Sequence, residues 1–233
     1  MSNLTWDSTV SSSDIISSVA LLFSIIALIQ NYLTSKKENE NSRASKRIRA
    51  EKLLDVALDL MNGGKTATSL FIDLYKSAED EERDFFERAR RNIKEAMKLA
   101  PNFYLCHHYM GIYVHRICGA SITERAERAL PYYKRAVELW EKDKSPGVKE
   151  DGWPYHDLAL VYSHLRRHQE TEEYYQKAIS VNGTTEPYFY ADFAEFNLNK
   201  GDTEKYKELY QEARRIALNT GRSFDRKNFL DEE

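Results

Sequence analysis

The chain has 233 residues, of which 42% are hydrophobic and 30% charged, and its formal net charge is −3. This length and composition suit one soluble domain with a packed core and room for a small additional element. The slightly acidic balance argues against a nucleic-acid-binding protein, whose surface carries an excess of positive charge.

A long apolar run lies near the N-terminus. Residues 15–33 read IISSVALLFSIIALIQNYL and contain no charge. About twenty apolar residues span the hydrocarbon core of a bilayer as a helix, so we predict a single transmembrane helix over 15–33, after a short segment over 1–14. A buried core helix and a cleavable signal peptide are the alternatives. The second needs a basic start, and no Lys or Arg precedes the run.

The residues after this run are rich in positive charge. They are Lys36, Lys37, Arg43, Lys46, Arg47, Arg49 and Lys52. Because positive charge stays on the cytoplasmic side of a membrane, we expect residues 1–14 outside and the rest in the cytoplasm, as a single-pass protein of a bacterial inner membrane. The same charges could also attract anionic headgroups, but Glu38, Glu40 and Glu51 dilute them and favour a role in topology alone.

The next segment, residues 34–65, joins the apolar run to the rest of the chain. Its first part, residues 34–45, is polar and is either a linker or an exposed continuation of the membrane helix. From Lys46 onward, apolar residues at three- and four-residue spacing predict a lead-in helix. Asn62-Gly63-Gly64 is a stop signal for that helix.

Two further helices are predicted before the middle of the chain. One covers Thr66 to Ala78, with its apolar residues on one face. The other begins at the acidic run 79–82, where negative charge favours a helix N-terminus, and reaches Leu99. Pro101 ends it.

A stripe of the form A-x3-aromatic or aliphatic-x2-A recurs in the last two-thirds of the chain. Its occurrences are Ala89-Ile93-Ala96, Ala129-Tyr133-Ala136 and Thr171-Tyr175-Ala178, with a weaker one at Tyr206-Tyr210-Ala213. Small residues also stand where two helices must touch, at Gly111 and Ala159. This pattern resembles the tetratricopeptide repeat. The usual first Trp of that repeat is replaced by His107, Tyr155 and Tyr190.

The resemblance covers residues 66–218 and implies an all-α solenoid of helical hairpins, preceded by the transmembrane helix. Stacked hairpins bury a continuous core and leave a concave face. The chain departs from the repeat at a longer turn around 118–121 and at a charged loop over 141–152. The polar, acidic tail over 219–233 is expected to fray.

In this family the inner faces of the first helices line the concave surface. By the repeat register, the candidate partner-binding groove consists of His108, Tyr109, Ile112, His115, Arg116, Trp153, His156, Asp157, Leu160, His164, Tyr188, Asp192 and Glu195. Aromatic anchors with interspersed polar groups suit a peptide groove. Packing against a neighbouring helix is the alternative role for any one of these residues. The Lys and Asn clamp with which some members hold a C-terminal carboxylate is absent, because His108, Ile112, His156 and Leu160 stand at its positions.

Candidate sites for chemistry are weak. The densest group of potential metal ligands, Cys106, His107, His108, His115 and Cys118, does not have the spacing of a zinc motif. The two cysteines would lie about 18 Å apart on one helix, too far for a disulfide. No phosphate-binding, dinucleotide-binding or catalytic sequence motif occurs. We therefore expect no catalytic residues, metal or cofactor.

The sequence thus predicts a membrane-tethered adaptor or scaffold without enzymatic activity. It would bind a protein or peptide on the concave face and contact the bilayer through residues 15–33, with no nucleic acid or small-molecule substrate. The alternative is a permanent structural or assembly subunit of a larger membrane complex.

Overall fold

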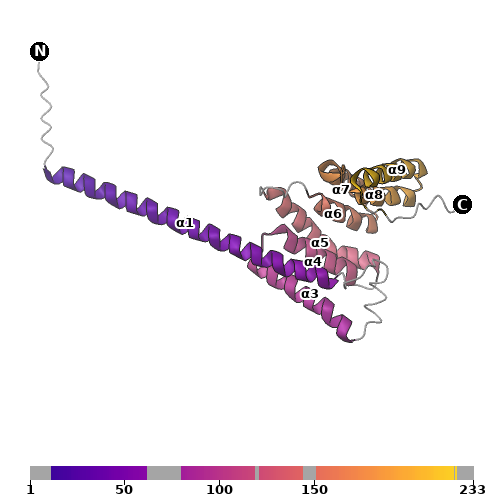
Figure 1. The fold of residues 1–233 in the computed structure, drawn as a ribbon, viewed down its shortest axis with the longest axis horizontal. Helices are drawn as coiled ribbons and strands as arrows, with labels where there is room; N and C mark the ends of the chain where they lie inside the picture. Colours follow the sequence, from indigo (N-terminus) through magenta and orange to yellow (C-terminus); the bar gives the residue numbers. More distant parts are fainter. Residues whose placement is uncertain (1–11, 62–79, 119–120, 144–150, 223, 225–233) are drawn as a thin grey trace, which may run out of the picture. The chain divides into compact units, whose positions relative to one another are not determined.

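The computed structural model describes residues 12–61, 80–118, 121–143, 151–222 and 224, with side chains from residue 25 in the first stretch and 85 in the second. The regular secondary structure of these described residues is helical, which confirms the all-α prediction. The helices are α1 (Ser12–Met61), α3 (Asp80–Leu99), α4 (Tyr104–Ile117), α5 (Ile122–Lys142), α6 (Trp153–His164), α7 (His168–Asn182), α8 (Pro187–Asn199) and α9 (Thr203–Thr220) (Figure 1).

The chain divides into two compact units, residues 1–46 and residues 47–233, which are described separately below as the N-terminal unit and the repeat unit. In the N-terminal unit, residues 34–45 belong to α1, so the polar segment continues the helix. Large apolar side chains over 25–33 are exposed, among them Leu28 at 68% and Tyr32 at 68%. The side chains of residues 15–24, the first half of the predicted span, lie outside the described part. Within the described residues, no helix has the length and apolarity needed to span a bilayer.

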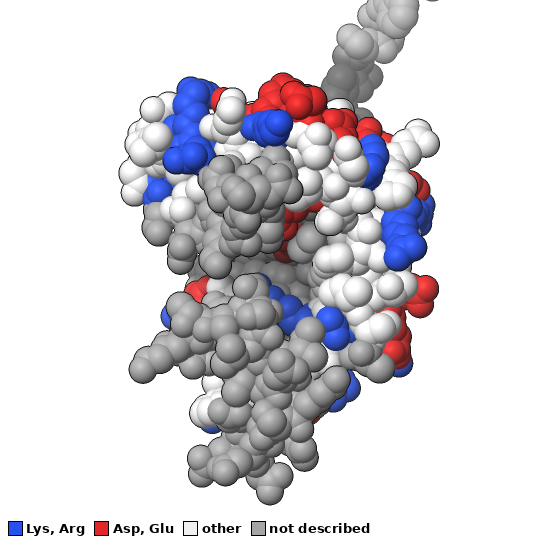
Figure 2. All heavy atoms as spheres, turned by 90° about the vertical axis from the view of Figure 1, so that its right-hand side faces the viewer, with Lys and Arg blue, Asp and Glu red and all other residues white. Residues whose placement is uncertain are grey.

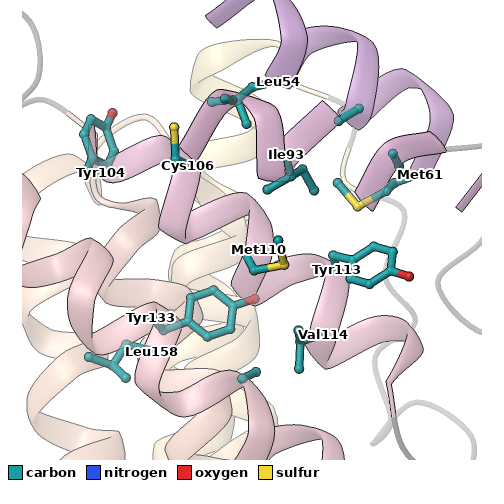
Figure 3. Packing of buried hydrophobic residues seen from close by; sticks show 14 of the residues in the cluster. Leu54, Met61, Ile93, Tyr104, Cys106, Met110, Tyr113, Val114, Tyr133 and Leu158 are labelled. Carbon is teal, nitrogen blue, oxygen red and sulfur yellow. The ribbon is translucent and has the colours of Figure 1, made fainter. Parts of the chain in front are cut away.

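The repeat unit begins with the last turns of α1, which confirm the lead-in helix. Leu54 and Met61 are buried there, and they join a core with Ile93 of α3 and Met110 of α4. Figure 3 shows residues from α1, α3, α4, α5 and α6 meeting in this cluster. The predicted helix over 66–78 and the stop signal after Met61 lie outside the described residues.

Three antiparallel hairpins follow α3: α4–α5, α6–α7 and α8–α9. Their second helices bury the repeating stripes as predicted, for example Ala129, Tyr133 and Ala136 in α5. Gly111 lies where α4 meets α5, and a Cβ there would lie 3.0 Å from the ring of Tyr133. The small residue therefore permits the close approach of the two helices. Figure 1 shows the hairpins stacked in chain order.

Local signals set the helix ends. The side chain of Ser121 accepts a bond from the Glu124 amide at 3.1 Å, and Asp202 accepts from the Lys205 amide at 3.0 Å, as N-caps do. Gly201, in the turn between α8 and α9, has φ +85°, a conformation that favours glycine. The charged loop noted in the sequence lies partly outside the described residues, since residues 144–150 are among those not described.

Candidate functional site

The inner face of the repeat unit is formed by the first helix of each hairpin. Ten of the thirteen predicted groove residues are half-buried: Tyr109, Ile112, Arg116, Trp153, Asp157, Leu160, His164, Tyr188, Asp192 and Glu195. They recur on α4, α6 and α8 at three- and four-residue spacing, so on each helix they share one face. These ten residues, here called the inner face, are the candidate contact surface.

The other three predicted groove residues are interior. His108, His115 and His156 are 5%, 8% and 3% exposed. They stand about a quarter-turn away from the inner stripe on their helices, on the side where one hairpin packs on the next. The alternative role, packing against a neighbouring helix, applies to these three.

A chain of imidazole and carboxylate groups joins the three first helices. Nε2 of His108 on α4 donates to Oδ2 of Asp157 on α6 at 2.8 Å. The other oxygen of Asp157 accepts from Nδ1 of His156 at 3.0 Å. Nε2 of His156 then donates to Oδ2 of Asp192 on α8 at 2.6 Å. This His–Asp chain links α4, α6 and α8 in order.

The charged groups of the His–Asp chain stabilise one another. Burial alone would lower the pKa of His156, but hydrogen bonds with Asp157 and Asp192 outweigh it and raise that pKa to about 9. Burial likewise opposes ionisation of Asp157, and its bonds with His108 and His156 nevertheless hold its pKa well below the usual range. His156 is therefore an imidazolium between two carboxylates at neutral pH.

A second link between α4 and α6 is uncharged. Nε2 of His115 lies 2.9 Å from Nδ1 of His164, so one ring donates and the other accepts. Burial lowers the pKa of His115 to about 4, with further lowering from His164, and burial also lowers the pKa of His164. Nε of the buried Arg125 donates to the carbonyl oxygen of His115 at 3.0 Å, which fixes α5 to the end of α4.

Aromatic rings pack around the charged histidine. His156 stacks on Phe189 with 5.0 Å between ring centroids, and Trp153 meets both rings edge-on at 5.0 and 5.1 Å. The half-buried indole of Trp153 is thus held by one ring of α6 and one ring of α8. Such a held aromatic costs little entropy on binding a partner.

This arrangement does not suit acid–base catalysis. Both ring nitrogens of His156 are engaged by carboxylates, so neither is left to accept a proton from a substrate. Within the described residues, no three His, Cys, Asp or Glu side chains converge on a metal position. Cys106 and Cys118 are both free, and burial raises the pKa of Cys106 to about 12 and also raises that of Cys118.

Surface charge on this unit is mixed. Figure 2 shows both Lys or Arg atoms and Asp or Glu atoms on the described part of one side of the molecule. Among the ten inner-face residues, the carboxylates Asp157, Asp192 and Glu195 outnumber the one Lys or Arg side chain, Arg116.

The sequence did not single out Arg125 or Phe189, which support the site from outside the inner stripe. Arg125 lies at the start of α5, where basic residues are ordinarily exposed. No periodic signal distinguishes it. Phe189 occupies the same repeat position as Cys106 and Pro154, and the absence of a charged side chain at all three positions is a sequence signal for the interior, where the structure places them.

Comparison with known proteins agrees with the helical repeat. Residues 120–182, which include the whole of α5, α6 and α7, match the tetratricopeptide repeat family. No curated protein matches the sequence of the chain. This stretch is less than half of the chain, and it confirms the repeat resemblance for these three helices.

Several solved structures resemble the fold at low identity. MamA matches at 16% identity and TM-score 0.47, over 81% of this chain and 96% of that one. BtubC from P. vanneervenii matches at 17% and 0.49, over 77% and 74%. MamA 41-end from Desulfovibrio magneticus RS-1 matches at 18% and 0.44, over 81% and 95%. Similarity at these identities and scores assigns no function to the chain.

Proposed function

We propose that the repeat unit is a scaffold that binds a protein or peptide segment on its inner face, without catalysis. The observation that carries this is a face of half-buried aromatic and polar side chains on α4, α6 and α8. Trp153 and Tyr188 share one repeat position on α6 and α8, and Tyr109 lies one turn further along α4, at the repeat position of Asp157 and Asp192. Large rings that are partly exposed yet held in place supply contact area, and neighbouring polar groups supply specificity.

The His–Asp chain gives this surface its rigidity. Because hydrogen bonds among His108, Asp157, His156 and Asp192 join α4, α6 and α8, the spacing of the aromatic residues is fixed before a partner arrives. Preorganisation of this kind lowers the entropic cost of association. The match of residues 120–182 to the tetratricopeptide repeat supports the same conclusion.

The second part of the proposal is a membrane tether. It is supported by the uncharged apolar run over 15–33, by the exposed apolar side chains over 25–33, and by the basic residues that follow. In this proposal residues 15–33 span a bacterial inner membrane, residues 1–14 lie outside, and the repeat unit faces the cytoplasm. Confinement to the membrane raises the effective concentration of the repeat unit for partners there, so that a partner is recruited to a membrane complex.

Proximity labelling in native membranes tests both parts. A labelling enzyme fused to the C-terminus would mark neighbours of the full chain, of a Tyr109→Ala/Trp153→Ala variant, and of a chain lacking residues 15–33. We expect a short set of proteins that is lost in the double variant, because the inner-face anchors are gone. The set should also fall when the apolar run is removed, because the tether is gone.

A matched control separates recognition from damage. Phe85 on α3 is an aromatic residue with 42% exposure, away from the inner face, and Phe85→Ala should leave the labelled set unchanged. Circular dichroism of each variant checks that helix content is retained. Labelling that is indifferent to Tyr109→Ala/Trp153→Ala in a folded chain would overturn the inner-face proposal. Fractionation of the full chain with soluble proteins would overturn the tether.

A further inference from the structure

The outer side of α4 carries a groove that the proposed function does not use. Two adjoining hollows of about 500 and 660 Å³ lie there, and both are lined by Val114, Cys118, Arg128 and Tyr132. One extends toward Arg90 and Lys94 of α3, and the other toward Met97 of α3 and Arg135 of α5. They form one groove with α4 as floor and α3 and α5 as walls, here called the outer groove.

The helix register places this groove opposite the inner face. On α4, His107, Val114 and Cys118 follow one another at seven and four residues and share one side of the helix. Tyr109, Ile112 and Arg116 stand on the other side, about half a turn away. A partner in the outer groove would therefore not compete with one on the inner face.

The next hairpin shows how such a groove is filled within the chain. The positions equivalent to His107 and Val114 are Tyr155 and Tyr162 on α6. Tyr155 packs on Trp140 of α5 at 4.9 Å and on Tyr174 of α7 at 5.9 Å, and Tyr162 packs on Tyr174 at 5.5 Å. Four aromatic rings thus occupy the space over α6, whereas smaller side chains leave the space over α4 open.

The lining of the outer groove is apolar at its floor and basic at its walls. Val114, Met110 and Ile117 are buried beneath it. Four cationic side chains line the two hollows, Arg90, Lys94, Arg128 and Arg135, against one carboxylate, Glu87.

The arginines are available to a ligand at little cost. Arg90 pairs with Glu87 at 3.3 Å, Arg128 with Glu124 at 2.7 Å, and Arg135 with Glu138 at 2.7 Å, all within one helix and partly exposed. Exposed pairs of this kind contribute little to the stability of a protein. A carboxylate of a partner can therefore replace the carboxylate of the chain.

From these observations we propose that the outer groove is a docking site for an acidic amphipathic helix of a partner protein. The apolar stripe of that helix would lie over Val114 and Met110, and its Asp or Glu residues would meet Arg90, Lys94, Arg128 and Arg135. The length fits, because α4 has 14 residues and offers a floor of about 20 Å. Helices with apolar residues at i, i+3, i+4 and i+7 bind in grooves of this form.

The test uses the full chain and a defined probe. The probe is a fluorescein-labelled peptide of about 14 residues, matched to α4, with Leu at i, i+3, i+4 and i+7 and Glu at the flanking positions; a second peptide carries Gln for every Glu. Fluorescence anisotropy should show binding of the Glu peptide and at least tenfold weaker binding of the Gln peptide. The binding should weaken with added salt, because rim charges are screened.

Variants locate the binding. Arg128→Glu/Arg135→Glu should reduce affinity for the Glu peptide at least tenfold, and His107→Tyr, which places a ring where Tyr155 lies in the next hairpin, should reduce it several-fold. Lys134→Glu is the matched control, because Lys134 is an exposed cation of α5 outside the hollows. It should change affinity less than twofold, as should Tyr109→Ala/Trp153→Ala on the inner face.

The outcomes that overturn this proposal are distinct. The first is no binding of the Glu peptide by the folded full chain. The second is binding that Lys134→Glu weakens as much as Arg128→Glu/Arg135→Glu does. The third is binding of phosphatidylglycerol vesicles, but not of the peptide, with the same sensitivity to Arg128→Glu/Arg135→Glu, which would assign the groove to a lipid surface. Loss of inner-face binding leaves these measurements unaffected.

Discussion

The hairpins α4–α5 and α6–α7 share one register but differ in what fills their outer side. Over α6, Tyr155 and Tyr162 pack on Tyr174 of α7 and fill the space between α5 and α7, the second helices of the two hairpins. Over α4, the equivalent residues are His107 and Val114, and the space is a groove with basic walls. The repeat position decides which way a side chain points, and the size of that side chain decides whether the chain fills the space itself.

On the side where hairpins stack, the two are alike. His108 and His156 occupy the same repeat position, and each donates to the Asp at the following position of the next hairpin, Asp157 or Asp192. Ala191 stands at the same position in α8, so the chain of bonds ends there. The polar link thus occurs twice, between α4 and α6 and between α6 and α8, the first helix of the last hairpin.

The largest expected effect comes from a substitution that breaks this shared link. Asp157→Ala removes the acceptor of two buried histidines, whereas Asp192→Ala removes the acceptor of one. Because an unpaired buried polar group is costly, we expect Asp157→Ala to lower the free energy of unfolding by about 3 kcal/mol and Asp192→Ala by about 1–2 kcal/mol. Urea denaturation followed by circular dichroism measures both. The reverse ranking would show that the link is not shared as described.

The second prediction compares the filled space over α6 with the open groove over α4. Tyr174→Ala removes the ring on which Tyr155 and Tyr162 pack, and should cost about 2–3 kcal/mol of stability. Tyr132→Ala, at the same position of α5, should cost about 1 kcal/mol or less, because one side of its ring borders the groove. Thermal unfolding of the two variants under one condition gives the comparison, and equal losses would mean that the outer groove is not open.

A third prediction concerns the dependence of stability on pH. The loss on the acid side reports on the hairpin α4–α5, and the loss on the alkaline side reports on the hairpin α6–α7. His115 has a pKa of about 4 in the folded chain against about 6.5 in the unfolded chain. The stability that the neutral ring of His115 contributes to the fold is therefore complete above pH 6.5 and is lost as pH falls toward 4. His156 has a pKa of about 9, so its contribution is complete below pH 6.5 and is lost as pH rises toward 9. Stability should be greatest near pH 6.5, with losses on the order of 2 kcal/mol on each side.

Variants show which histidine causes the loss of stability on each side of pH 6.5. His115→Gln should flatten the loss between pH 6.5 and 4, apart from the smaller contribution of His164, whose pKa is also lowered. His156→Gln should flatten the loss between pH 6.5 and 9, after an overall drop in stability. The measurement is the midpoint of urea unfolding at a series of pH values. A loss of stability on the acid side that persists unchanged in His115→Gln would refute this account.

The smallest expected effect concerns the contact inside each hairpin. A Cβ on Gly111 would lie 3.0 Å from the buried ring of Tyr133, whereas α6 carries Ala159 at this position. Gly111→Ala gains about 1 kcal/mol of helix propensity and loses about 1–3 kcal/mol to overpacking, so we expect a net loss of about 1 kcal/mol. Ala159→Gly should lose a similar amount through propensity alone. Differential scanning calorimetry measures both changes. A higher unfolding temperature for Gly111→Ala would show that α5 moves away to accommodate the added methyl group.

Much of the fold followed from periodicity. The stripes centred on Ile93, Tyr133, Tyr175 and Tyr210 predicted the buried faces of α3, α5, α7 and α9, because a 3.6-residue period fixes which residues face inward. Interior and surface were harder to separate on the first helices. The repeat register placed His108, His115 and His156 with the groove, yet each is buried and bonded to a neighbouring hairpin.

The sequence by itself determined the described helices, their order, the small residues at helix contacts and the buried face of the second helix of each hairpin, because these depend on local propensity and spacing. Only the tertiary structure decided that Asp157 accepts from two histidines and that the space over α4 is open while that over α6 is filled. Both depend on groups about fifty residues apart or on three helices at once, and no local pattern encodes the distance between them.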